Sequence, residues 1–519
     1  MSETRQNRAF GVISGTASNY ARQVVDVVVF MFLTPFTAHM LGKDAFGLWS
    51  LMWSTVGLFA LFDFGYSSAV VKFVADARGR SDLDRLGRVT ATFFWVHIAL
   101  GALMLLAAAG CAPLVPHIFR IPAGLGHAAS TVFFLLAFRA AYGMPMSMFA
   151  SILVGFQRQV FVNLIKILST LVYAAVTYAV FTWRPSVASL AWINLLTFVV
   201  SSAVTMLIST RINPGVRVAP RFFDRTMLRE ISSFSAYSFV IQVSSLLYTR
   251  VDAIVIQQFL DLSKVAYYSV AMSTVAKAGL LCSQFSAALT PLLAELKGAG
   301  DNDAIRTVLR KASKLTTAMA TPLLVGLLWF SRPLIEVWMK PEYAPAVMPL
   351  RYLLLAAFIG IVHSVPDTVL SMTGHQRFTS MASIAGQVLN LILTLVMVVP
   401  LGINGVALAT LLASTLIEAG VICPRACRTY HLSIFAFYRT ALLPSVVPCA
   451  LMLGAVWALQ QVLPPTALWR IAVLELGACL VFAASFGLLG LSAKERAYYG
   501  ERITAMLRRR SHTATPERR

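Results

Sequence analysis

Charged side chains are scarce in this chain of 519 residues. Asp, Glu, Lys and Arg make up 13% of it, and apolar residues make up 58%. An ordinary soluble domain carries about 25% charged residues. A water-soluble globule of this composition would have to expose much apolar surface, so the composition predicts a membrane-embedded chain. Acidic residues are the scarcest charged type, since 22 Asp and Glu stand against 43 Lys and Arg.

Sequence patterns for common chemical sites are also missing. The six cysteines lie in or at the ends of apolar stretches, and none has zinc-ligand spacing with histidines. The chain contains neither a glycine-rich phosphate loop nor a His/Asp/Glu cluster with metal spacing. An enzyme would therefore have to work inside the membrane or on very short loops. We predict a protein that is not an enzyme and that holds no cofactor or metal.

Long apolar runs predict an all-α integral membrane protein of about 14 transmembrane helices. A helix needs roughly 20 mostly apolar residues to cross the hydrocarbon layer. Uninterrupted runs of this length favour helices over the strands of a barrel. The expected spans are 12–38, 46–71, 89–115, 128–154, 160–182, 187–210, 232–259, 265–292, 314–338, 347–373, 379–400, 403–424, 438–462 and 469–491.

Basic residues between these spans predict the orientation of the chain. The loops and tails on the side of the N-terminus hold 30 Lys and Arg, and those on the opposite side hold 8. Because cytoplasmic loops are enriched in Lys and Arg, both termini are expected in the cytoplasm of a bacterium, with the chain in its inner membrane. The net charge of +21 then reports topology, and no nucleic-acid partner is expected. Arg508, Arg509 and Arg510 in the tail suit an anionic membrane lipid.

An internal repeat at an offset of 219 residues predicts two lobes. Residues 54–56 (STV) match 273–275, and 155–158 (GFQR) match 374–377 (GHQR). The offset spans six helices, so both copies would cross the membrane in the same direction. They would be related by a pseudo-two-fold axis along the membrane normal, an arrangement typical of transporters that work by alternating access. The expected parts are an N-lobe at 1–211, a cytoplasmic linker at 212–231, a C-lobe at 232–430, two extra helices at 431–492 and a basic cytoplasmic tail at 493–519.

Ionisable residues inside the expected spans are candidate site residues, because a charge in hydrocarbon is costly unless it faces a partner or a wet cavity. The basic ones are predicted to line a cationic cavity for an anionic substrate: Arg22, Arg139, Lys166, Arg250 and Lys277. The acidic candidates for coupling to a proton or sodium ion are Asp26, Asp63, Asp252 and Asp367.

Structural roles remain open for several of these residues. Arg22 and Asp26 lie four residues apart on one helix face and would neutralise each other if they paired. Lys166 is close enough to the cytoplasmic end of its span to snorkel. Glu418 and Glu475 lie near span ends, so we expect them to be solvated.

Three segments resemble a known family. Residues 41–49 (LGKDAFGLW) and 61–65 (LFDFG) look like the N-terminal signature of polysaccharide-repeat-unit (Wzx-type) flippases. Residues 401–410 (LGINGVALAT) resemble another hallmark of the same superfamily, the multidrug/oligosaccharidyl-lipid/polysaccharide exporters. The resemblance implies transfer of an undecaprenyl-diphosphate-linked oligosaccharide to the outer leaflet for surface polysaccharide biosynthesis, with Arg22 and Arg250 meeting the diphosphate. A polysaccharide polymerase and a coupling ion are the candidate partners it implies.

Two other functions remain open from the sequence. A multidrug exporter, or an exporter of another anionic lipid, would belong to the same superfamily. Drug antiporters favour acidic cavities, and the deep basic residues here argue against that choice. A membrane-embedded polysaccharide polymerase or ligase would need catalytic groups on a substantial outer loop. The longest outer loops offer only His117, Arg120, Glu336 at a helix end, and Glu342.

Overall fold

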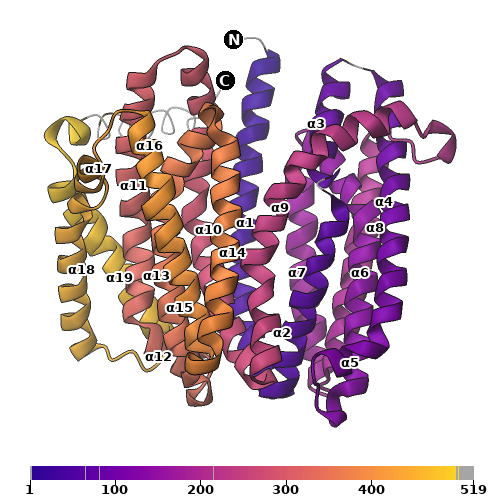
Figure 1. The fold of residues 1–519 in the computed structure, drawn as a ribbon, viewed down its shortest axis with the longest axis horizontal. Coiled ribbons are helices and arrows are strands. Elements are labelled where there is room, and N and C mark those ends of the chain that lie inside the picture. Colours follow the sequence, from indigo (N-terminus) through magenta and orange to yellow (C-terminus); the bar gives the residue numbers. More distant parts are fainter. Residues whose placement is uncertain (1–2, 65, 81, 214, 498–500, 502–519) are drawn as a thin grey trace, which may run out of the picture. The chain divides into compact units, whose positions relative to one another are not determined.

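The computed structural model describes residues 3–64, 66–80, 82–213, 215–497 and 501. These residues are almost entirely helical and contain no strand, which confirms the predicted all-α class (Figure 1). The chain divides into two compact units. The first comprises Met1–Val270 with Leu391–Val406, and the second comprises Ala271–Asn390 with Ala407–Arg519. Most of the predicted tail, including Arg508–Arg510, lies outside the described residues.

The first unit holds the helices from α1 to α9 and the beginning of α10. Their bounds are α1 (Glu3–Leu41), α2 (Lys43–Gly57), the 3-10 helix η1 (Leu58–Asp63), α3 (Tyr66–Gly79), α4 (Leu83–Cys111), η2 (Ala112–Leu114), α5 (Val115–Ile118), α6 (Ala123–Gly155), α7 (Gln159–Phe181), α8 (Val187–Ile212), η3 (Pro220–Phe222), α9 (Arg225–Phe259) and α10 (Leu262–Gly298). Asp82, Ser186 and Asp224 begin α4, α8 and α9, because each side chain accepts a hydrogen bond from a free backbone amide of the first turn.

The second unit contains the later helices. Their bounds are α11 (Asn302–Trp329), α12 (Ser331–Trp338), η4 (Pro341–Ala346), α13 (Val347–Leu370), the π-helical turn η5 (Ser371–His375), α14 (Gln376–Leu401), α15 (Ile403–Ser414), the π-helix η6 (Thr415–Ile422), α16 (Cys423–Thr429), α17 (Ile434–Ala441), α18 (Leu443–Val462), α19 (Leu468–Ser485) and η7 (Phe486–Gly490). The last part of α14 and the start of α15 belong to the first unit. A bend of 63° separates α11 from α12.

The described residues contain ten helices long and apolar enough to cross a membrane, or up to eleven if the bent α11–α12 pair is one span. The chain is therefore a multi-pass membrane protein. α9 and α10 occupy the expected spans 232–259 and 265–292 but are not among those ten. The count of fourteen spans, the lobe boundaries and the two-fold symmetry stay predictions.

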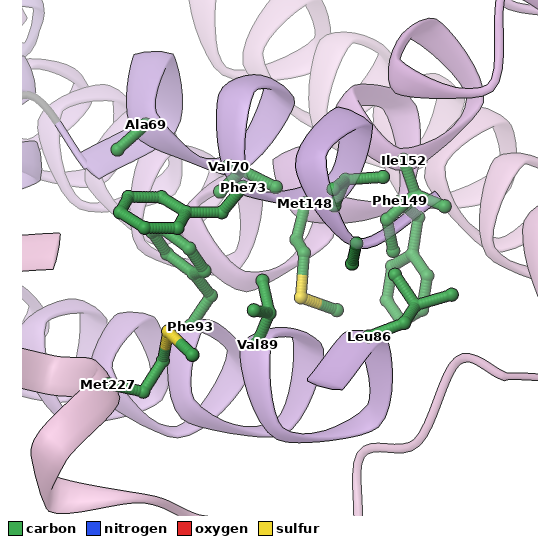
Figure 2. Packing of buried hydrophobic residues seen from close by; sticks show 12 residues of the cluster. Ala69, Val70, Phe73, Leu86, Val89, Phe93, Met148, Phe149, Ile152 and Met227 are labelled. Atoms are coloured by element: carbon green, nitrogen blue, oxygen red, sulfur yellow. The ribbon is translucent and has the colours of Figure 1, made fainter. Parts of the chain in front are cut away.

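A tightly packed apolar cluster joins α3, α4 and α6 within the first unit. Figure 2 shows Phe73 of α3 beside Phe93 of α4, with Met148 and Phe149 of α6 completing the cluster. The rings of Phe73 and Phe93 lie 6.5 Å apart between centroids. These side chains are almost completely buried, so close packing holds α3, α4 and α6 together.

Candidate functional site

The interface between α1 and α7 is polar along several helical turns. Asn163 Nδ2 donates hydrogen bonds to Ser18 Oγ at 2.8 Å and to Asn19 Oδ1 at 2.9 Å. Gln159 Nε2 donates to the same Asn19 oxygen at 3.1 Å. Amide side chains satisfy one another across the two helices here, which is how polar groups are accommodated between helices in a membrane.

Charged residues continue this interface along both helices. Arg22 Nη1 lies 3.0 Å from Asp26 Oδ2, and Thr170 Oγ1 donates to the other carboxylate oxygen of Asp26 at 3.2 Å. Lys166 lies within electrostatic range of both Arg22 and Asp26. Two cations thus lie near one carboxylate, so these three side chains together have a net positive charge. The side chains of Arg22 and Asp26 are 27% and 25% exposed, respectively, so neither is fully buried.

The spacing of these residues explains why they meet. Residues three or four apart lie on one face of a helix, and each helix carries such a polar row. We call the following set the α1–α7 polar cluster: Ser18, Asn19, Arg22 and Asp26 of α1, with Gln159, Asn163, Lys166 and Thr170 of α7. The pairing of Arg22 with Asp26, which the sequence left open, is present in the structure.

Arg139 of α6 has a different environment. Its guanidinium carbon lies 4.2 Å from the ring centroid of Phe198 and 5.1 Å from that of Trp53. Cation–π contacts of this kind stabilise a partly desolvated arginine. Arg139 thus lies between aromatic rings, and it is not one of the residues of the α1–α7 polar cluster.

Arg250 of α9 packs against the end of α2. A Cβ atom at Gly57 would lie 2.7 Å from Arg250 Nε, so the glycine is needed for this close approach. A few residues later, in η1, the Ala60 carbonyl accepts a hydrogen bond from Gln242 Nε2 of α9 at 2.8 Å. α9 therefore contacts the region where α2 changes into the 3-10 helix η1 at two points.

Asp63 ends η1 and pairs with a residue that the sequence analysis did not single out. His97 Nε2 of α4 lies 3.1 Å from Asp63 Oδ1. His97 is fully buried between the rings of Phe93 and Tyr66, and its Nδ1 has no hydrogen-bond partner among the described residues. A lone histidine in the apolar run of α4 was the only sequence signal for this pair. Asp252 also has a partner, because the Tyr268 hydroxyl donates to its carboxylate.

The acidic residues of the second unit are placed differently. Asp367 of α13 and Glu418 of η6 lie within electrostatic range of each other. Both carboxylate oxygens of Glu475 are buried, and neither has a hydrogen-bond partner in the part of the chain that the structure describes. The expectation that Glu475 is solvated is wrong, because the bare backbone of Gly326 in α11 lets the carboxyl group pack against that helix. Lys277, the remaining basic candidate, is half-buried on α10.

An apolar groove of about 600 Å³ runs between α7 and α8. Its lining includes Leu168, Val172 and Val176 of α7, together with Trp192, Leu196 and Val200 of α8. The two helices are neighbours in the first unit (Figure 1).

Within the described ranges, no group of three or more His, Cys, Asp or Glu side chains is arranged to hold a metal ion.

A family model described as "Polysaccharide biosynthesis protein" matches residues 36–348, which is more than half of the chain. The chain belongs to this polysaccharide biosynthesis protein family. The resemblance found in the sequence is thereby confirmed at the level of the family. Arg22 and Asp26 precede the matched residues of this polysaccharide biosynthesis protein, and Asp367 follows them.

Two curated relatives and one solved structure extend the comparison. "Uncharacterized membrane protein EpsK" of Bacillus subtilis is 22% identical over 65% of this chain and 67% of its own length. "Putative O-antigen transporter" of Shigella flexneri is 21% identical over 72% of this chain and 88% of its own length. The solved structure of the lipid II flippase MurJ, in its inward closed conformation, matches with a TM-score of 0.69 at 16% identity. That match covers 91% of this chain and 98% of MurJ, and it shows a shared fold.

Proposed function

We propose that this polysaccharide biosynthesis protein is a flippase. It moves an undecaprenyl-diphosphate-linked oligosaccharide from the inner to the outer leaflet of the bacterial inner membrane by alternating access. Both termini lie in the cytoplasm. The family assignment supports a role in polysaccharide biosynthesis. The name of the Shigella flexneri relative and the fold shared with a lipid II flippase support transport of a lipid-linked saccharide.

The α1–α7 polar cluster is the observation that carries this proposal. A sugar–diphosphate headgroup cannot enter hydrocarbon without replacement of its water and counterions. Arg22 and Lys166 offer two positive charges against one carboxylate, and their nitrogens form strong charge-assisted hydrogen bonds to phosphate oxygens. The neighbouring amides and hydroxyls of the cluster suit the sugar or the remaining phosphate oxygens.

The other candidate residues receive distinct proposed roles. Arg250 and Lys277 contact the anionic headgroup at other stages of transport. Arg139 acts indirectly, by holding Trp53 and Phe198 in place through its cation–π contacts. The Asp63–His97 pair, Asp252 and Asp367 are the proposed carriers of a coupling proton or sodium ion. A polysaccharide polymerase is the proposed protein partner that uses the translocated lipid.

Deletion of the gene, followed by analysis of lipid-linked oligosaccharides, tests the proposed function. An added glycan-cleaving enzyme reports which leaflet holds the accumulated lipid, and mass spectrometry identifies the glycan. Accumulation protected on the inner face is the expected result. Accumulation on the outer face would instead indicate a polymerase or ligase. No accumulation, combined with new sensitivity to cationic drugs, would indicate a multidrug exporter.

A further inference from the structure

We propose that the groove between α7 and α8 holds the isoprenoid chain of the lipid-linked substrate while its diphosphate lies at the α1–α7 polar cluster. This inference rests on the proposed function and adds the position of the hydrocarbon part of the substrate. It makes α7 the helix that contacts both chemical halves of one lipid.

The lining of the groove is mostly apolar and suits a hydrocarbon chain better than a sugar or a phosphate. Its exposed side chains are aliphatic or aromatic, as with Val172, Leu196 and Val200. Ser169 also lines it, as do the hydroxyl groups of Ser189, Thr197 and Ser201, each of which already forms a hydrogen bond with a nearby residue of the chain. They therefore have little hydrogen-bonding capacity left for a polar ligand, and a sugar or phosphate would lose more hydrogen bonds than it gained there.

The groove extends along several turns of α7. Its lining on α7 extends from Ile165 to Val180, which at 1.5 Å per residue corresponds to about 22 Å. The hydrocarbon core of a bilayer is about 30 Å thick. A chain seated along the groove would follow most of that thickness, whereas a compact drug would occupy only part of it.

The groove and the cationic cluster lie on adjacent faces of the same helix. Ile165 lines the groove, and the next residue, Lys166, belongs to the cluster. Ser169 and Thr170 repeat this relation one turn later. Successive residues are about 100° apart around a helix. An anionic headgroup at Arg22 and Lys166 would thus lie one face of α7 away from the groove, a separation that a long, flexible isoprenoid chain can span.

Charge complementarity selects the occupant. Arg22 and Lys166 outnumber Asp26, so the cluster has a net positive charge and favours an anionic headgroup. A diphosphate-linked isoprenoid carries such a headgroup, whereas an ordinary zwitterionic phospholipid has no net charge to offer. The same groove with a neutral cluster would have favoured any membrane lipid equally.

Site-specific photo-crosslinking in living cells tests the position of the chain. A benzoyl-phenylalanine is placed at Val172, which is 51% exposed and lines the groove, or at Leu171, which is 47% exposed and does not. After irradiation, the lipid attached to the purified protein is identified by mass spectrometry. We expect isoprenoid-linked saccharide at position 172, several-fold enriched over position 171. Equal capture at both positions, or phospholipid alone at position 172, would overturn the proposal.

Three further variants separate this inference from the function on which it rests. Arg22→Ala should reduce capture of the isoprenoid lipid at position 172, because the headgroup is no longer held. Val176→Trp should block the groove and lower surface polysaccharide, while Leu171→Trp should not. If gene deletion traps lipid-linked saccharide on the inner face and position 172 captures none, the groove proposal is wrong and the flippase function stands. If deletion causes no accumulation, the flippase function itself fails.

Discussion

Acidic side chains inside the helices differ between the two units in whether they have hydrogen-bond or ion-pair partners. In the first unit, Asp26 pairs with Arg22, Asp63 pairs with His97, and Asp252 accepts a hydrogen bond from Tyr268. In the second unit, Asp367, Glu418 and Glu475 have no hydrogen-bond or ion-pair partner among the residues that the structure describes. Each of the three acids of the first unit thus has a polar partner in place. An unpaired carboxylate in a membrane is costly, so each acid of the second unit is a candidate to bind a proton or a cation.

The strongest test of this difference removes a cation from the first unit. Arg22→Ala deletes one charge of the α1–α7 polar cluster and leaves Asp26 without its ion-pair partner. We expect near-complete loss of surface polysaccharide at a normal level of the protein in the membrane. Arg22→Lys should retain part of the activity because it keeps the charge but loses the fork of the guanidinium group.

The double variant Arg22→Ala/Asp26→Ala is the control for that experiment. If Arg22 serves only to neutralise Asp26, removing both charges restores surface polysaccharide. Continued loss of the polymer in the double variant is expected, because the phosphate-binding cation is still absent. Full restoration would contradict the role proposed for Arg22.

The second test breaks the pairing of a buried acid. His97→Ala removes the imidazole that pairs with Asp63, and removal of one member of a buried pair typically costs about 3 kcal/mol or more. The detergent-solubilised protein should therefore unfold at a clearly lower temperature. Asp63→Asn, which keeps an oxygen facing His97, should cost less. Equal unfolding temperatures for wild type and His97→Ala would show that the pair does not stabilise the first unit.

The third test removes an acid without a hydrogen-bond partner from the second unit. Here we expect the stability of the protein to rise, whereas it falls in the second test. Glu475→Leu replaces a buried carboxyl group that lacks hydrogen bonds, so it should raise stability by about 1 kcal/mol. Thermal unfolding measures the change, and surface polysaccharide reports whether the acid is used. A variant that is more stable but inactive would assign Glu475 to ion coupling. A variant that is less stable would mean that Glu475 has a stabilising partner.

The smallest effect concerns an ion pair outside the spans. Burial alone would raise the pKa of Glu495, but hydrogen bonds from Lys314 and Ser492 outweigh it and hold that pKa below its ordinary value. A carboxyl group with a lowered pKa in the folded state stabilises the fold at higher pH and loses this contribution as the pH falls through that pKa. Glu495→Gln should therefore lower the unfolding temperature slightly above about pH 5, where a free glutamate is ionised. The two proteins should converge near about pH 3.

A matched control for that measurement exists in the second unit. Glu336 forms an ion pair with Arg332, whose side chain is 71% exposed. Exposed pairs contribute little because water and salt screen them. Glu336→Gln should leave the unfolding temperature unchanged at every pH. A pH-dependent shift as large as that of Glu495→Gln would remove the distinction between the two pairs.

Much of this protein was determined locally, by the sequence alone. Long apolar runs produce helices and place the chain in a membrane, because a span must satisfy its own backbone hydrogen bonds. The glycine-containing segments 41–49, 61–65 and 401–410 carried the family resemblance. The Arg22–Asp26 pair was also foreseeable, since both residues lie one turn apart on a single helix.

Only the tertiary structure decided which distant residues meet. His97 lies 34 positions from Asp63, and Asn163 lies 145 positions from Ser18. The burial of Glu475 depends on Gly326 of another helix. The groove forms where α7 and α8 pack against each other, with their valines and Trp192 lining it. Helical periodicity tells which face of a helix is polar, but it carries no information on which helix that face will contact. Packing between helices chose those partners, and with them the candidate binding site.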